Sequence, residues 1–171
     1  MSILDLIDIE KVRRAIMYIA ALFGTLVLQN MVISRFPVFG AKALFVPALI
    51  IAIGLFEGGV WGGVFGLIAG LLGDSAFSGN TVLFTIVFPV LGFCAGLLAD
   101  FMINRRFFSF MLLALVSLGV TALSQVFPLF AFEGAALGDL LSTAVVQTLW
   151  SLPFAAPIYL VVKKIAESSE D

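Results

Sequence analysis

The chain has 171 residues, of which 62% are hydrophobic and 12% are charged, and its mean hydropathy is +1.20. A soluble domain is roughly 45–50% apolar and about 25% charged, and so short a chain could not hide this much apolar surface from water. With a net charge of −2 and no basic run longer than two residues, the composition gives no support for nucleic-acid binding and predicts a single-domain integral membrane protein.

Residues 1–14 precede the first long apolar run, and we expect them to form a cytoplasmic segment. Four of their apolar side chains either form one face of a short interfacial helix or belong to a frayed tail: Ile3, Leu4, Leu6 and Ile7. No convincing small-x-small cleavage site follows, so we interpret the apolar run as a retained signal-anchor helix.

Four apolar runs are long enough to cross a bilayer, which needs about 20 residues. They cover residues 15–33, 81–99, 107–130 and 140–162. Residues 42–74 would make one helix of about 48 Å, far longer than a ~30 Å hydrocarbon core. Two short helices with a turn at Glu57-Gly58-Gly59 fit better, and a re-entrant pair stays open. We therefore expect six transmembrane helices in one domain over residues 15–163, followed by a cytoplasmic tail over residues 164–171.

Basic residues are divided unevenly between the two sides of this arrangement. If both termini face the cytoplasm, only Arg35 and Lys42 lie outside. The other seven then lie inside: Lys11, Arg13, Arg14, Arg105, Arg106, Lys163 and Lys164. Cytoplasmic segments carry an excess of Lys and Arg, so we predict that both termini are cytoplasmic.

Glycines recur at every fourth position in the third and fourth expected helices. The positions are Gly58, Gly62, Gly66 and Gly70, and then Gly92 and Gly96. This spacing leaves a groove on one helix face, in which a second backbone can approach closely. We interpret these glycines as candidate helix-docking residues, either between these two helices of the same chain or for the helix of a partner.

Carboxamide side chains form the second group of candidates: Gln29, Asn30, Gln125 and Gln147. All four fall near the outer ends of their expected helices. Carboxamides in a bilayer need hydrogen-bond partners, so we expect these side chains to face the bundle interior. They either line a shared polar cavity open to the outer side or hydrogen-bond between helices.

Acidic residues occur singly, at the expected helix ends. Asp74 begins a turn that contains Gly79 and ends at Asn80, which we expect to cap the following helix. Glu57 and Asp100 occupy other helix ends, where a capping or loop role is expected.

The residue types that chemistry would need are sparse. The sequence has no histidine, the commonest general base and metal ligand, and its carboxylates do not cluster as metal ligands would. Cys94 is the single cysteine, so it allows no internal disulfide and no thiolate cluster, and we expect a small buried hydrophobe there. We therefore expect no enzyme activity, no metal and no cofactor.

Several short motifs occur in a fixed order along the chain, and their order and spacing together carry a resemblance to a known family. Residues 62–74 form a glycine-spaced helix that ends in a Gly-Leu-Leu-x-Asp pattern, and the glycine turn at 78–80 and the pair Gly92 and Gly96 follow. A Leu-Gln-Asn motif at 28–30, a short loop at 35–40 and a closing segment at 147–159 complete the order. Over about residues 15–165 the chain resembles the MreD family of rod shape-determining membrane proteins.

The resemblance implies a six-helix fold similar to the substrate-binding subunits of energy-coupling-factor transporters. It also implies a non-enzymatic component of the bacterial cell-elongation complex in the cytoplasmic (inner) membrane. The implied partners are an MreC-like bitopic scaffold, the actin-like MreB, RodA and a class-B penicillin-binding transpeptidase of peptidoglycan synthesis; self-association stays open. The alternative is a small-molecule, vitamin-type binding subunit of an energy-coupling-factor transporter, with the four carboxamides lining its pocket.

Overall fold

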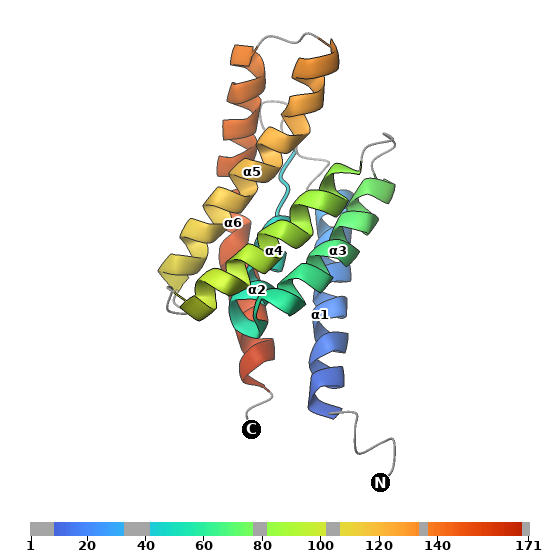
Figure 1. Ribbon diagram of the computed structural model, residues 1–171, viewed down its shortest axis with the longest axis vertical. Coiled ribbons are helices and arrows are strands. Elements are labelled where there is room, and N and C mark those ends of the chain that lie inside the picture. Colours follow the sequence, from blue (N-terminus) through green and yellow to red (C-terminus); the bar gives the residue numbers. More distant parts are fainter. Residues whose placement is uncertain (1–8, 33–41, 77–81, 102–106, 134–136, 169–171) are drawn as a thin grey trace.

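The computed structural model describes residues 9–32, 42–76, 82–101, 107–133 and 137–168. These residues form six α-helices and one π-helical turn, with no strand among them (Figure 1). In chain order the elements are α1 (Ile9–Val27), the π-helical turn η2 (Leu28–Val32), α2 (Val46–Glu57), α3 (Gly59–Ala76), α4 (Leu83–Phe101), α5 (Phe107–Glu133) and α6 (Leu137–Glu167). The expected all-α class and the six helices are confirmed.

Four of the helices are long and apolar enough to cross a membrane. They contain the segments Glu10–Met31, Leu83–Asp100, Phe107–Phe127 and Gly138–Glu167. The helices α2 and α3 are also apolar but shorter. With 12 residues, α2 is about 18 Å long, well below the ~30 Å of a hydrocarbon core. The expected division of residues 42–74 into two short helices is thus confirmed.

The long helices extend further than their apolar runs predicted. The helix α1 begins at Ile9, so part of the expected N-terminal segment is helical, and α6 continues to Glu167 rather than ending near residue 162. Arg, Lys and Glu are good helix formers, so they end an apolar run without ending the helix. Residues 3–7, the expected interfacial helix, lie outside the described residues.

The short helix α2 is the centre of the bundle. Every residue from Val46 to Leu55 is buried, and α2 contacts α1, α3, α4, α5 and α6. A helix that is apolar on all sides is expected to be enclosed in this way. At its end, Gly58 has a φ of +93°, a backbone conformation that a side chain would strain, and α3 starts at the next residue.

The glycine spacing brings α3 and α4 together within the chain. A Cβ atom placed on Gly66 would lie 2.5 Å from the carbonyl oxygen of Phe88, and one on Gly70 would lie 2.5 Å from that of Phe84. Gly62 and Gly92 face each other in the same contact, and Gly96 faces Gly59. The sequence left two interpretations open, packing within the chain or docking of a partner helix. Since α4 covers the glycine face of α3, this face packs within the chain.

Two residues around this contact differ from their expected setting. Gly58 lies in the α2–α3 turn rather than inside α3, and nothing stands within 4 Å of the place its own Cβ would take, but its main-chain carbonyl carbon lies beside Gly96 of α4. Cys94 is exposed rather than buried, because it lies on the other side of α4 from the buried small residues Gly92, Ala95 and Gly96.

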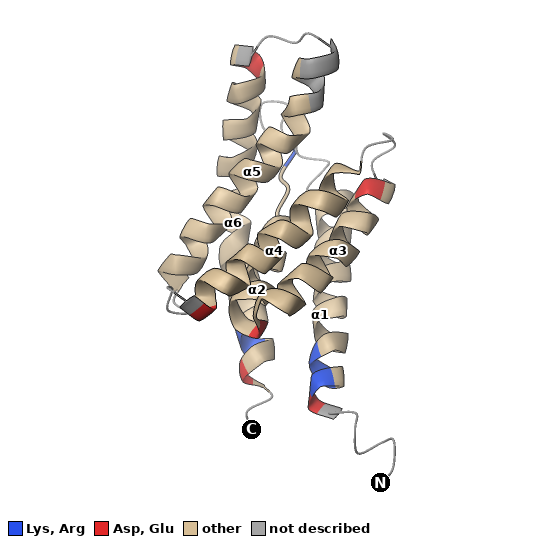
Figure 2. Cartoon of the chain, in the orientation of Figure 1, with Lys and Arg blue, Asp and Glu red and all other residues tan. Residues whose placement is uncertain are grey.

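Basic residues gather at one end of the bundle. The first turns of α1 carry Lys11, Arg13 and Arg14, and the last turns of α6 carry Lys163 and Lys164. These turns lie at the same end of the molecule, which we call the basic end (Figure 2). Asp74 and Asp139 lie toward the opposite end, at the C-terminal end of α3 and the start of α6.

We predict that Gly66→Ala and Gly70→Ala each lower the free energy of unfolding by about 1–3 kcal/mol, because the added methyl group would meet a carbonyl oxygen of α4. Gly24→Ala in α1 is the matched control: its Cβ would meet nothing within 4 Å, and alanine favours a helix by about 1 kcal/mol. Unfolding followed by circular dichroism in a single detergent measures all three. Equal stability of the Gly66→Ala and Gly24→Ala proteins would contradict the packing.

Candidate functional site

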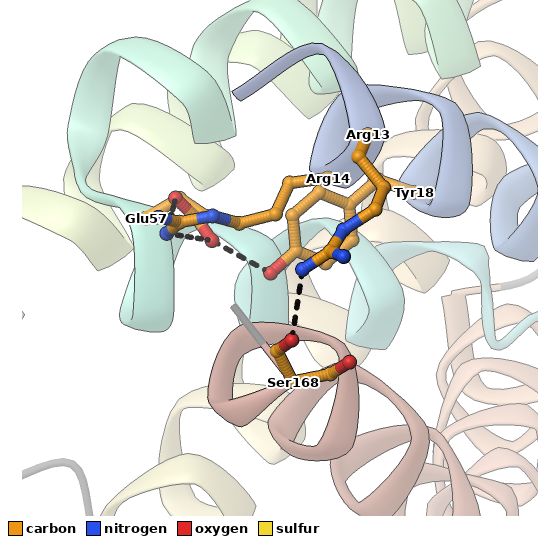
Figure 3. Close-up of polar contacts among 5 residues, drawn as sticks. All are labelled: Arg13, Arg14, Tyr18, Glu57 and Ser168. Atoms are coloured by element: carbon orange, nitrogen blue, oxygen red, sulfur yellow. Dashed lines mark hydrogen bonds and ion pairs between the residues drawn. The ribbon is translucent and has the colours of Figure 1, made fainter. Parts of the chain in front are cut away.

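Three side chains meet at the basic end, where α1 passes the turn between α2 and α3. Arg14 and Tyr18, one turn apart on α1, point toward Glu57 at the end of α2 (Figure 3). The Arg14 Nη1 lies 3.4 Å from both carboxylate oxygens of Glu57, and the Tyr18 hydroxyl donates a hydrogen bond of 2.8 Å to Glu57 Oε1. These contacts anchor α1 to the α2–α3 turn.

The environment of this cluster is largely closed. The side chains of Arg14 and Glu57 are 27% and 14% exposed, and the ring of Tyr18 packs edge-on against Phe65 of α3 at 5.8 Å between centroids. The adjoining cavity, which Trp61 also lines, measures only about 50 Å³. That is room for a few water molecules, so we interpret the cluster as a structural ion pair rather than a ligand pocket.

A second contact at the basic end joins α1 to α6. The Arg13 Nη2 donates a hydrogen bond of 3.0 Å to the main-chain oxygen of Ser168 (Figure 3). A carbonyl oxygen satisfies one donor of the guanidinium but does not neutralise its charge. The two helices are therefore tied together at a point that stays positively charged.

Asp74 caps the start of α4. Its two carboxylate oxygens accept hydrogen bonds from the main-chain N–H groups of Phe84 and Thr85, at 3.1 and 2.8 Å, and one of them also accepts the Thr85 hydroxyl at 2.6 Å. The sequence predicted this role for Asn80, which lies outside the described residues, as does Gly79. Asp74 takes the position because an α3 that packs closely on α4 brings its C-terminal end beside the N–H groups of α4.

Gln29 performs the same task for α2. Its Oε1 accepts hydrogen bonds from the main-chain N–H groups of Phe45 and Val46, at 3.0 and 3.3 Å, and its side chain is buried. Ser151 of α6 accepts a third, from the N–H of Leu44 at 2.9 Å. Gln29 thus hydrogen-bonds to the chain leading into another helix, which was one of the two expectations. Ser151 was missed, because nothing in the sequence separates it from other helical serines.

The other three carboxamides do not gather around a shared cavity in the described structure. The Gln125 amide nitrogen donates to the main-chain carbonyl of Thr121 in its own helix, and the Gln147 side chain does not line the cavity that holds the other two carboxamides among the described residues. Asn30 shares with Gln29 only a cavity of about 10 Å³, which holds at most one water molecule. No group of three or more Cys, Asp or Glu that could hold a metal occurs among the described residues.

Two apolar grooves lie between helices of the described structure. The α5–α6 groove measures about 430 Å³ and is lined by Leu115, Gly119, Leu123, Leu141, Ala144, Val145, Thr148 and Leu149. The α1–α6 groove measures about 310 Å³ and is lined by Ala21, Gly24, Thr25, Leu28, Phe45, Leu49, Phe154, Pro157, Ile158 and Val161. Neither was foreseen, because Gly24 and Gly119 stand alone in the sequence and form no repeat.

No protein-family model, no curated protein and no solved structure matches this chain.

We predict that Glu57→Ala lowers the free energy of unfolding by about 2–3 kcal/mol, because it leaves the shielded Arg14 without its carboxylate. The double variant Arg14→Leu/Glu57→Leu is expected to lose far less, since the pair is removed together. Glu167→Ala is the matched control: Glu167 pairs with Lys163 at 3.6 Å on an exposed surface, and such pairs contribute less than about 1 kcal/mol. Chemical unfolding measures the set, and equal losses for Glu57→Ala and Glu167→Ala would contradict the role of the shielded pair.

Proposed function

We propose that this chain is a multi-pass integral membrane protein that docks the membrane-spanning helix of a bitopic partner, as a non-enzymatic component of the bacterial cell-elongation complex. The resemblance to the MreD family supplies the cellular context, and with it the proposed partners MreC, MreB, RodA and a class-B transpeptidase. It also supplies the proposed likeness to the substrate-binding subunits of energy-coupling-factor transporters.

The apolar exterior supports the membrane location. Large apolar side chains are exposed on the outward faces of the helices, with Phe108 79%, Val60 72% and Phe23 62% exposed. Soluble monomers rarely expose contiguous apolar patches larger than a few hundred Å². Lipid or partner helices would cover such a surface, and the gathered Lys and Arg residues favour a cytoplasmic location for the basic end.

The α5–α6 groove is the observation that carries the docking proposal. Helices in membranes associate through close packing at small residues, since lipid tails are as apolar as the helices themselves. The ladder on α3 is already covered by α4, whereas Gly119 has nothing within 4 Å of its Cβ position and shares its groove with the small residue Ala144. A single partner helix therefore fits the α5–α6 groove better than the glycine face of α3, which α4 already covers.

The vitamin-binding alternative is less well supported. It needs a polar pocket large enough for a small molecule, and ligand pockets are typically about 300–1,000 Å³. Of the four carboxamides, Gln29 and Asn30 share the ~10 Å³ cavity, while the described residues bring neither Gln125 nor Gln147 to it.

We predict that green fluorescent protein fused after Ser168 fluoresces in bacteria and that alkaline phosphatase fused there is inactive, because the basic end faces the cytoplasm in our proposal. Alkaline phosphatase inserted between α5 and α6, after residue 135, is expected to be active. Reversed activities of the two phosphatase fusions would contradict the proposed orientation.

We predict that Gly119→Leu fills the α5–α6 groove and lowers recovery of the bitopic scaffold by roughly tenfold, equivalent to about 1.4 kcal/mol of packing, without unfolding the chain. Gly66→Leu and Gly70→Leu also disrupt shape control, but through lost folding. The measurement is affinity purification from native membranes in mild detergent, followed by mass spectrometry. Leu67→Phe, on the exposed face of α3, is the matched control.

Two results would contradict this proposal. One is a Gly119→Leu protein that recovers the scaffold as well as the wild type does. The other is recovery of paired ATPases with a coupling membrane subunit instead of a scaffold, which would favour the transporter alternative.

A further inference from the structure

The α1–α6 groove differs from the α5–α6 groove in what lies at its end. Its walls are α1 and α6, and it is also lined by Phe45, just before the central helix α2, and by Leu49 of α2. The Arg13–Ser168 hydrogen bond ties the two walls together at the basic end. The groove lining is therefore almost wholly apolar, and beyond its Ala21 and Val161 end both walls continue to the basic end of the molecule.

Helical periodicity aligns basic residues of both walls with this groove. Arg14 of α1 is one of them, about three turns before the lining residue Thr25, but its guanidinium is paired with Glu57. On α1, Arg13 precedes the lining residue Gly24 by about three turns, and on α6, Lys164 follows the lining residue Pro157 by about two turns. Residues separated by whole turns lie on the same helix face. Lys163, by contrast, is rotated about 100° from Lys164 and pairs with Glu167 at 3.6 Å.

We propose that the α1–α6 groove binds one acyl chain of an anionic glycerophospholipid, whose phosphate headgroup lies against Arg13 and Lys164. The groove volume of about 310 Å³ is at the lower end of the range for ligand sites, which suits a chain better than a bulky ring system. Basic pockets between transmembrane helices on the cytoplasmic side are a known form of lipid headgroup site.

A partner helix suits this groove less well than a lipid. A helix with its side chains is about 10–12 Å across and continues past both ends of any surface it covers. Here the occupant would meet the charged Arg13 bridge at one end, where an apolar helix gains nothing. An acyl chain ends at a phosphate, so the apolar length and the positive end of the groove match the two parts of one molecule.

This inference depends on the proposed membrane location and is independent of the proposed partner. The chain contains two tryptophans, and Trp150 packs edge-on against the groove residue Phe154 at 6.0 Å between centroids. In a Trp61→Phe background, Trp150 is the only tryptophan, so bromine on an acyl chain in the groove would quench its fluorescence.

The experiment compares brominated phosphatidylglycerol with brominated phosphatidylcholine in vesicles that contain the reconstituted protein. We expect phosphatidylglycerol to quench Trp150 with at least about fivefold higher apparent affinity, the effect of one basic side chain near an anionic lipid. Arg13→Gln and Lys164→Gln are each expected to lower this preference by roughly fivefold or abolish it. Lys163→Gln is the matched control and should preserve it.

Filling the groove tests its position. Gly24→Leu places a side chain in open space and is expected to remove the lipid preference, whereas Gly119→Leu in the α5–α6 groove should preserve it. If Gly24→Leu fails to fold, Leu28→Phe fills the same groove from an exposed position.

Equal quenching by the two lipids overturns the inference. So does a preference that survives Gly24→Leu, or one that Lys163→Gln lowers as much as Lys164→Gln does. Vesicle flotation and scaffold recovery are measured on the same variants. If the wild-type protein does not float with the vesicles, the membrane location is contradicted. If it floats but does not recover the scaffold, only the proposed partner is contradicted.

Discussion

A main-chain N–H group at the start of a buried helix needs an acceptor, and the bundle is arranged around that requirement. The first four N–H groups of a helix have no partner within it. At α2, Gln29 accepts those of Phe45 and Val46, Pro47 has none to offer, and Ala48 donates to the carbonyl of Phe45 at 3.1 Å. This helix begins inside the bundle, so water cannot hydrogen-bond to an N–H group that lacks a protein acceptor, and each such group would destabilise the fold.

This requirement determines how distant parts of the chain are joined. Gln29 lies in the π-helical turn that ends the first helix, and Ser151 lies in the last helix. Between them they accept the N–H groups of three consecutive residues at the start of α2: Leu44, Phe45 and Val46. The i→i+5 bonds of a π-helical turn change the direction in which its side chains leave the axis. Asp74 joins α3 to α4 by the same principle, so two helix starts are held by side chains from other helices.

Much of the fold follows from the sequence. The hydropathy pattern predicts the number of helices, and the adjacent glycines predict the α2–α3 turn. The apolar runs locate all six helices, and the Glu57-Gly58-Gly59 turn is correct. The expected turn or cap role of Asp74 agrees with its hydrogen bonds to α4, but its particular partners Phe84 and Thr85 were not foreseen. The buried position expected for Cys94 is wrong, and Gly58 lies in the α2–α3 turn rather than inside a helix. Each depends on which helix faces meet in space, a property that no local pattern contains.

The candidate site is harder to predict for the same reason. Glu57 meets Arg14 and Tyr18 across a large separation in sequence. The four carboxamides look equivalent, although in the described part of the chain it is Gln29 that accepts main-chain hydrogen bonds at the start of α2. A carboxamide at a helix end needs hydrogen-bond partners. Which of the four carboxamides meets the start of α2 depends on how α1, α2 and α6 pack together. The site residues could therefore be nominated from the sequence but not ranked.

Two pairs of helical glycines differ in the space beside them, and the difference is informative about function. Spaced glycines attract attention in a sequence, yet Gly66 and Gly70 have their space filled by α4, so no further packing energy is available from them. Gly24 and Gly119 stand alone in the sequence, and each has open space beside it within an apolar groove. Association in a bilayer draws on new close contacts. External binding to this bundle is therefore expected at the isolated glycines rather than at the repeated ones, and the basic residues beside one groove alone give the two sites different occupants.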